Sequence, residues 1–87
     1  MRLIKTRKTK KYNRLIYIAK LIKTTVEIDE EDISSDLITE FEKHNFVAVK
    51  LCQLMQKRGV LKNSTIAGAI KKRDGFIFIL NPKITKL

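Results

Sequence analysis

The lysine and arginine side chains point to a chemistry, because they are gathered into blocks. Residues 1–24 hold nine bases and no acid, residues 25–42 hold eight acids and no base, and residues 43–87 hold ten bases with Asp74 as the one acid. The net charge is +10 over 87 residues. Concentrated positive charge attracts polyanions, because each neutralised phosphate releases condensed counterions. We therefore expect a protein that binds nucleic acid.

The remaining reactive residues do not suggest catalysis. A single cysteine, Cys52, and a single histidine, His44, are too few for a structural zinc site, and one cysteine forms no disulfide within the chain. The acidic stretch at 27–32 has no companion histidine or lysine in a catalytic arrangement, and the sequence holds neither a glycine-rich phosphate loop nor a nucleophile motif. We expect a protein that is not an enzyme and holds no cofactor and no metal.

Size and composition fit one small domain. The apolar share of 44% supplies a packed core, and no apolar run approaches the roughly 18 residues of a membrane span. A lone thiol is compatible with a reducing cytoplasm, or with the host cytoplasm for a phage or viral protein. Residues 1–10 contain few apolar side chains and predict a basic flexible arm, followed by a single domain at 11–87.

The pattern beyond the arm predicts three helices. From Lys11 on, apolar residues recur at a spacing of three or four: Leu15, Ile18, Ala19 and Ile22. A second helix is expected to begin at Ser34 or Ser35, where a hydroxyl caps the backbone amides. The third helix covers 46–58 and ends at Gly59, as is typical of a left-handed C-terminal cap.

The end of the chain predicts strands. Residues 76–80 are aromatic and β-branched, and the Asp74-Gly75 pair before them is a turn signal. Residues 65–73 fit either a strand that pairs with 76–80 or a helix capped by Ser64. The strand is the preferred interpretation.

Three helices followed by a hairpin resemble a winged helix-turn-helix domain over about 33–83. The run 51–62 (LCQLMQKRGVLK) is similar to the end of a winged-helix recognition helix, and the run 72–82 (KRDGFIFILNP) resembles the second wing strand of small arsenic-repressor-like regulators. The expected fold class is α+β, a three-helix helix-turn-helix core with a C-terminal β-hairpin. In the alternative, the run 63–72 (NSTIAGAIKK) resembles a helix-turn-helix recognition helix supported by 46–58.

The resemblance implies a regulator of transcription or replication that acts by occupying duplex DNA. The third helix would present Lys50, Gln53 and Lys57 to the major groove. The hairpin tip would hold backbone phosphate or reach the minor groove with Lys71, Lys72 and Arg73. The bases expected to follow phosphate from the N-terminal part are Lys5, Arg7, Lys8, Lys10, Lys11 and Arg14.

Two alternatives stay open at this point. Flexible bases also bind RNA, so the charge does not choose the nucleic acid. Apolar residues on the outer face of the third helix, Phe46, Val49 and Leu54, favour contact with protein, either in a homodimer or with a different chain. In that case the molecule is a protein-binding accessory or inhibitor factor, phage- or virus-like, on a helix-turn-helix scaffold.

Overall fold

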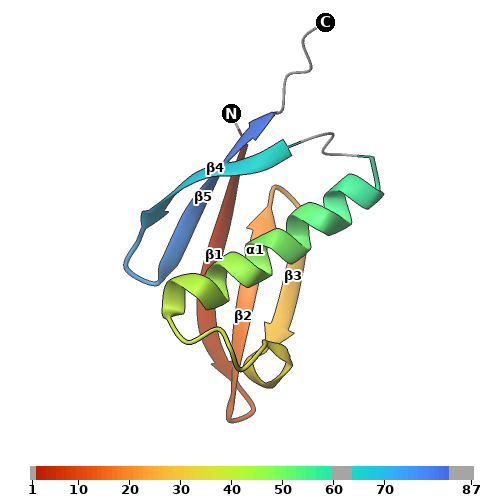
Figure 1. Ribbon diagram of the computed structural model, residues 1–87. Helices are drawn as coiled ribbons and strands as arrows, with labels where there is room; N and C mark the ends of the chain where they lie inside the picture. Colours follow the sequence, from red (N-terminus) through yellow and green to blue (C-terminus); the bar gives the residue numbers. More distant parts are fainter. Residues whose placement is uncertain (1, 60–63, 83–87) are drawn as a thin grey trace, which may run out of the picture.

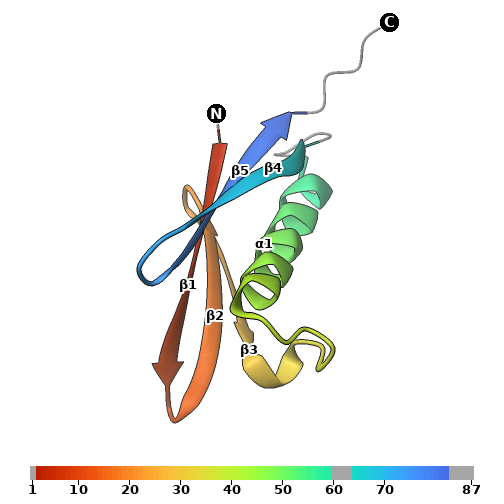
Figure 2. The ribbon, with the colours of Figure 1, turned by 60° about the vertical axis from the view of Figure 1, so that its left-hand side comes forward.

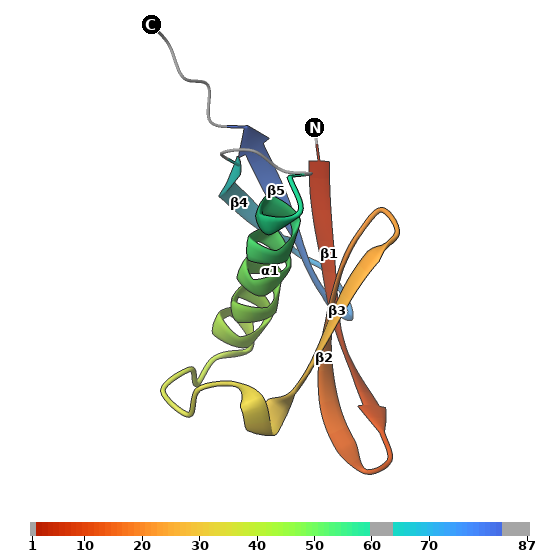
Figure 3. The ribbon, with the colours of Figure 1, turned by 90° about the vertical axis from the view of Figure 1, so that its right-hand side faces the viewer.

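The computed structural model describes residues 2–59 and 64–82. Within these ranges one α-helix packs on a five-stranded antiparallel sheet (Figure 1). The elements are β1 Arg2–Lys11, β2 Arg14–Leu21, β3 Thr24–Asp29, the short 3-10 helix η1 Glu30–Asp32, α1 Glu40–Lys57, β4 Ser64–Lys71 and β5 Gly75–Pro82. The strand order is β3-β2-β1-β5-β4, so the first strand is the centre of the sheet. Side views show α1 on one face of the sheet (Figures 2 and 3).

The predicted winged helix-turn-helix fold is wrong. Where three helices were expected, the described residues form one α-helix and an antiparallel sheet, so the fold class and the winged-helix and helix-turn-helix descriptions fail together. The alternative recognition helix is wrong as well, because Ser64–Lys71 is strand β4. Residues 60–63, which belong to the two runs quoted for these resemblances, lie outside the described residues.

The predicted first helix is instead the end of β1, a turn and strand β2. The run 15–22 is apolar on both faces of a strand, so it satisfies a helical spacing as well as an alternating one. Its alternate residues Tyr17, Ala19 and Leu21 are buried in the core under α1. Ile18, between them, faces the other side of the sheet and is 4% exposed. The sheet therefore carries apolar residues on both of its faces here.

The predicted flexible arm is wrong too, because residues 2–11 form the central strand. β1 is antiparallel to β2 on one side and to β5 on the other. Only Ile4 and Thr6 of this strand are buried, and its other side chains are exposed or half-buried. A strand with so few apolar residues is held by two ladders of backbone hydrogen bonds, which composition does not reveal.

The helix that was predicted over 46–58 begins earlier, at Glu40, and ends close to the predicted residue, at Lys57. Thr39, not Ser34 or Ser35, is the N-cap: its hydroxyl accepts the backbone N–H of Glu42 (3.1 Å), while the Glu42 carboxylate accepts the backbone N–H of Thr39 (3.1 Å). Gly59 follows the last turn with φ +76°, which confirms the predicted glycine stop. The predicted strand at 76–80 and the strand interpretation of 65–73 are also confirmed, within β5 and β4.

The core lies between α1 and the helix-facing side of the sheet. The buried side chains of the helix are His44, Val47, Ala48, Leu51, Cys52 and Met55. They meet the largest buried side chains of the strands, Tyr17, Phe78, Ile4 and Leu21. Cys52 belongs to this core, and burial raises the pKa of its thiol. The pairing of β1 with β5 places Ile4 and Phe78 side by side on the wall of the core that faces α1.

Gly75 is required where β5 meets β1. It pairs with Arg7, and a Cβ at this position would overlap the backbone carbonyl of Thr6 and lie 2.9 Å from the Cα of Arg7. We expect Gly75→Ala to lower the free energy of unfolding by about 1–3 kcal/mol, as overpacking against rigid backbone does. Urea denaturation measures the change. Gly68→Ala in β4 is the matched control, because its Cβ would meet nothing within 4 Å. Equal unfolding midpoints for the two variants would contradict this reading of Gly75.

Candidate nucleic-acid interface

The open face of the sheet carries an unpaired cluster of bases. Strand alternation directs Lys5 and Arg7 of β1 to this face, away from buried Ile4 and Thr6. Lys20 of β2 is the cross-strand partner of Lys5, so the two ammonium groups project from neighbouring strands on the same face. The structure gives none of these three side chains an ion pair or hydrogen bond within residues 2–59 and 64–82. They are therefore available to an external anion.

Two adjoining hollows connect these bases across the open face of the sheet. One hollow of about 430 Å³ runs over β1, β2 and β3 and is lined by Lys5, Thr6, Arg7, Ile18, Lys20, Thr25 and Glu27. A second, of about 370 Å³, lies beside the β4–β5 hairpin and is lined by Lys5, Thr6, Lys72, Arg73, Asp74, Gly75, Phe76 and Ile77. Because both are lined by Lys5 and Thr6, they meet at β1. We call this pair of hollows the open-face groove.

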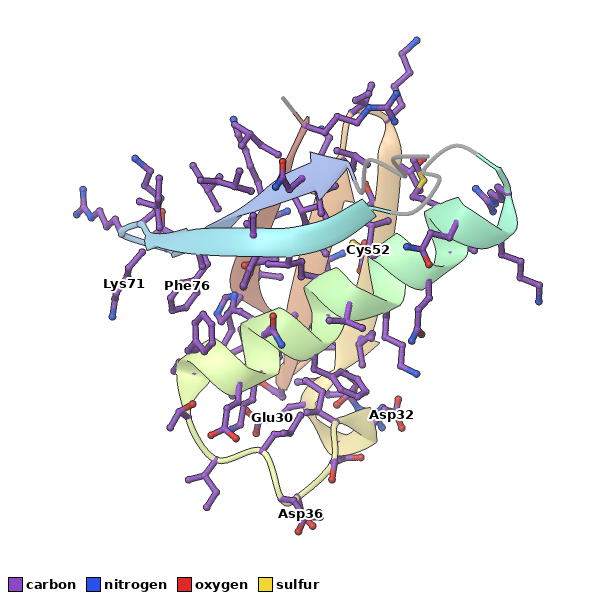
Figure 4. All side chains as sticks on the ribbon, turned by 45° about the horizontal axis from the view of Figure 1, so that its top comes forward. Glu30, Asp32, Asp36, Cys52, Lys71 and Phe76 are labelled. Atoms are coloured by element: carbon purple, nitrogen blue, oxygen red, sulfur yellow. The ribbon has the colours of Figure 1, made fainter. Side chains whose placement is uncertain are left out.

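The β4–β5 hairpin brings the late bases to the early ones. Its loop is closed by a hydrogen bond from the backbone N–H of Lys72 to the carbonyl of Gly75 (2.7 Å). Since Gly75 pairs with Arg7, the loop bases Lys72 and Arg73 lie at the height of Arg7 on β1. Figure 4 shows Lys71 at the tip of this hairpin, well apart from the labelled acids Glu30, Asp32 and Asp36. Bases from the two ends of the sequence therefore share one region.

Other predicted contact residues form ion pairs with acids of residues 25–42. Lys8 donates to Glu40 (3.0 Å), Lys11 to Glu27 (3.0 Å) and Arg14 to Asp29 (3.3 Å). Lys11 and Arg14 flank the β1–β2 turn, beyond the part of β1 that pairs with β5. Lys10 also lies beyond that part and is exposed. The N-terminal bases thus divide into a paired set and an unpaired set.

The residues predicted to read the major groove lie on another surface. Lys50, Gln53 and Lys57 are exposed on α1, on the side away from the sheet. The open-face groove is on the opposite side of the molecule, so the structure does not bring these three residues together with Lys5 and Arg7. The proposed protein-contact residues Phe46, Val49 and Leu54 are half-buried on the helix. Phe46 packs against the core and carries the Lys50 ammonium 5.3 Å from its ring centre.

A polar cluster is buried on the helix side of β1. His44 is 3% exposed within α1 and places Nδ1 2.8 Å from the hydroxyl oxygen of Thr6. That oxygen also accepts the backbone N–H of Phe76 (3.3 Å). The other ring nitrogen, Nε2, lies 3.7 Å from a Glu40 oxygen. We assign the proton of neutral His44 to Nε2, because a bare nitrogen would repel that carboxylate.

Tyr17 and Lys8 complete the cluster around Glu40. The Tyr17 hydroxyl donates to Glu40 (3.1 Å), and burial together with Glu40 and Glu30 raises its pKa. Burial disfavours the charged form of Glu40, but hydrogen bonds from Lys8 and Tyr17 outweigh this and lower its pKa. Thr6 is not an accessible nucleophile, because it is 5% exposed and its hydroxyl is held in the sheet. The cluster therefore joins β1, β2 and α1.

Sequence reasoning missed Lys20 and the buried Thr6–His44 pair. Lys20 falls inside the run that was expected to be helical, and the signal for its role is the alternation of Ile16, Ile18 and Lys20 on one face of a strand. Thr6 and His44 are 38 positions apart, and no local pattern predicts their contact.

Comparisons with protein families, with curated proteins and with solved structures found no match to this chain. In the part of the chain that the structure describes, no helix is long and apolar enough to cross a membrane. The same residues include no group of three or more side chains suited to hold a metal ion. The chemistry of the site is therefore argued from its own residues.

The buried His44 predicts a loss of stability in mild acid. Burial lowers the pKa of His44, Lys8 and Lys71 act in the same direction, and Glu40 opposes them. Below pH of about 6.5, the ordinary histidine value, the unfolded chain binds a proton that the folded chain resists. The stability from neutral His44 is thus present at pH above that value and is lost as the pH falls toward the lowered pKa, by at most about 1.4 kcal/mol per unit. Urea unfolding at pH 7.5 and pH 5.5 measures the difference.

The control is His44→Gln, which is expected to be less stable overall but to lose the pH dependence in this interval. His44 is the one histidine in the sequence. The carboxylates Glu40 and Glu42 have lowered pKa values and titrate below this interval. An unchanged slope in the variant would show that another group is responsible.

Proposed function

We propose that this protein binds duplex DNA through the phosphate backbone, using the open-face groove and the hairpin loop, and acts in regulation by occupying the duplex. The observation that carries the proposal is the set of unpaired bases that the groove collects from β1, β2 and the hairpin. These bases are Lys5, Arg7, Lys20, Lys72 and Arg73. Two carboxylates, Glu27 and Asp74, line the same groove, and Glu27 is already paired with Lys11.

Phosphate contact is favoured over base stacking. Sheets that bind single strands present aromatic rings on which bases stack. In the described strands, the side chains of the open face include isoleucines and bases but no aromatic residue. The aromatic residues of β2 and β5, namely Tyr17, Phe76 and Phe78, point to the helix side instead. A face without stacking rings suits a backbone contact that reads charge rather than single bases.

The β4–β5 hairpin at the edge of the sheet also suits a duplex. The major groove admits a two-stranded β-ribbon, and the three adjacent bases at the tip of β4–β5 would meet phosphates on its walls. RNA helices have a deep and narrow major groove that is closed to such an element. Duplex DNA is thus the better-supported partner, with duplex RNA as the competing outcome of the test.

A second candidate is a protein-binding accessory factor, and one observation favours it. Leu3 and Ile70 are 39% and 47% exposed on the open face, close to half-buried Ile77 and Ile79. These apolar side chains lie beside Lys5, so a protein partner would desolvate an unpaired ammonium group. That cost makes the protein partner the weaker of the two candidates.

The salt dependence of binding tests the groove. Each phosphate contact with duplex DNA contributes about 0.9 to the slope of log affinity against log salt. We expect Lys5→Gln/Lys20→Gln to reduce this slope by about 2 and to weaken binding of a labelled mixed-sequence duplex. Fluorescence anisotropy over a series of salt concentrations, with duplex DNA and duplex RNA in parallel, gives both values.

The matched control is Lys50→Gln/Lys57→Gln, which removes the same charge from the exposed side of α1. We expect its salt slope to equal that of the unchanged protein. Equal losses in both double variants would mean that binding follows net charge alone. A larger loss in the helix variant would place the contact on α1, and no duplex binding at low salt would remove the proposal.

A further inference from the structure

A separate cleft lies on the helix side of the hairpin. Its volume is about 410 Å³, and it opens between the β4–β5 loop, β1 and the first turn of α1. Five bases line it, Arg7, Lys8, Lys71, Lys72 and Arg73, together with the carboxylates Glu40 and Asp74. Without Arg7, whose side chain projects to the open face, the lining carries four positive charges and two negative ones. The open-face groove lies on the other side of the same loop.

Lys71 belongs to this cleft and not to the groove. It pairs with Phe76 across the hairpin, and Phe76 makes ring contacts with His44 and Phe41 of α1 (centroids 5.0 and 5.4 Å). Cross-strand partners share a face of the sheet, so Lys71 projects to the helix side. Figure 4 shows Lys71 and Phe76 near the tip of the hairpin. No described residue forms an ion pair or hydrogen bond with the Lys71 ammonium group.

The cleft is open to solvent and has a well-ordered inner wall. This wall is formed by His44, which is almost fully buried and is fixed by its hydrogen bond to Thr6. Phe76 lies against the His44 ring at this wall. The wall therefore presents a fixed surface against which a bound group can rest.

The charge of the cleft favours a phosphomonoester. An internal phosphodiester carries one negative charge, but a phosphomonoester carries about −1.5 to −2 at neutral pH and offers three acceptor oxygens. The surplus of bases in the cleft matches the higher charge. Phe76 and the 46% exposed Phe41 supply an apolar edge for the attached nucleoside. The volume is within the range of small-ligand pockets, about 300–1,000 Å³.

We propose that the helix-side cleft binds a terminal phosphomonoester of a nucleic-acid strand, with Lys71 as the residue specific to this site. The proposal rests on the proposed function, because a bound duplex supplies the strand end. The end of a strand would lie on one side of the hairpin, and the duplex backbone would follow the other side. A free nucleoside monophosphate offers the same group and is distinguished from a strand end by the experiment.

The experiment compares otherwise identical oligonucleotide duplexes with a 5′-phosphate, a 3′-phosphate or hydroxyl ends. Competition titration measures the ratio of affinities for phosphorylated and unphosphorylated ends. We expect at least one phosphorylated duplex to bind about tenfold more tightly, as one charge-assisted contact provides. Lys71→Gln is expected to bring this ratio close to one. Lys20→Gln, the matched control in the groove, is expected to weaken all duplexes alike and to keep the ratio.

A second measurement separates the cleft from the groove. Nucleoside 5′-monophosphate and inorganic phosphate are titrated by NMR while the ring signals of His44 and Phe76 and the amides of 71–76 are followed. Saturable shifts at these positions, weakened in Lys71→Gln and kept in Lys20→Gln, support the cleft even where duplex binding fails. Equal affinities for all ends together with no shift at His44 overturn it, and so does a ratio that survives Lys71→Gln.

Discussion

The structure depends on the placement of a basic strand at the centre of the sheet. β1 carries six lysine and arginine residues and is paired along both edges. Its two faces lie in different environments, because one faces α1 and the other faces solvent. On the side that faces α1, Thr6 contacts His44 and Lys8 pairs with Glu40. Facing away, Lys5 and Arg7 are left to the solvent. A buried charge without a partner is costly, whereas an exposed one is not, so the unpaired bases of β1 are exposed.

The sorted charge in the sequence becomes sorted charge in space through the β1–β2–β3 meander. The chain passes from the basic block into the acidic block at β3, and the tight antiparallel turns bring the acids beside the bases near the β1–β2 turn. Lys11 forms an ion pair there with Glu27, and Arg14 forms one with Asp29. The opposite half of β1 pairs with β5 instead, whose flanking loop is basic. The same strand therefore carries the ion-paired bases Lys8 and Lys11 in its second half and the unpaired bases Lys5 and Arg7 in the part that pairs with β5.

The sequence predicts this fold only where local signals are strong. The helix body over 46–57, its glycine stop and the β4–β5 hairpin could be found, because periodicity, a left-handed cap and a turn pair are local. β1 could not be found in this way: with Ile4 and Thr6 as its only buried side chains, its stability comes from backbone pairing with strands distant in sequence. β2 was misread because Tyr17 and Ile18 are both buried, on opposite faces, and a run that is apolar on both faces has no single period. The hairpin bases could be predicted as a cluster, but their meeting with Arg7 depends on the β1–β5 register.

Side-chain alternation explains how one short hairpin serves two surfaces. Lys71, the last residue of β4, shares the helix-facing side with Phe76, while the loop residues Lys72 and Arg73 line hollows on both sides. Gly75 lets the backbone of β5 approach Thr6 and Arg7 closely enough for the loop to reach across β1. A larger residue there would separate the loop from the strand and divide the two basic regions. The approach of β5 to β1 thus places three adjacent bases at the boundary between the two faces of the sheet. Phe76 and His44 lie on the helix side of these bases, and the open charged face lies on the other side.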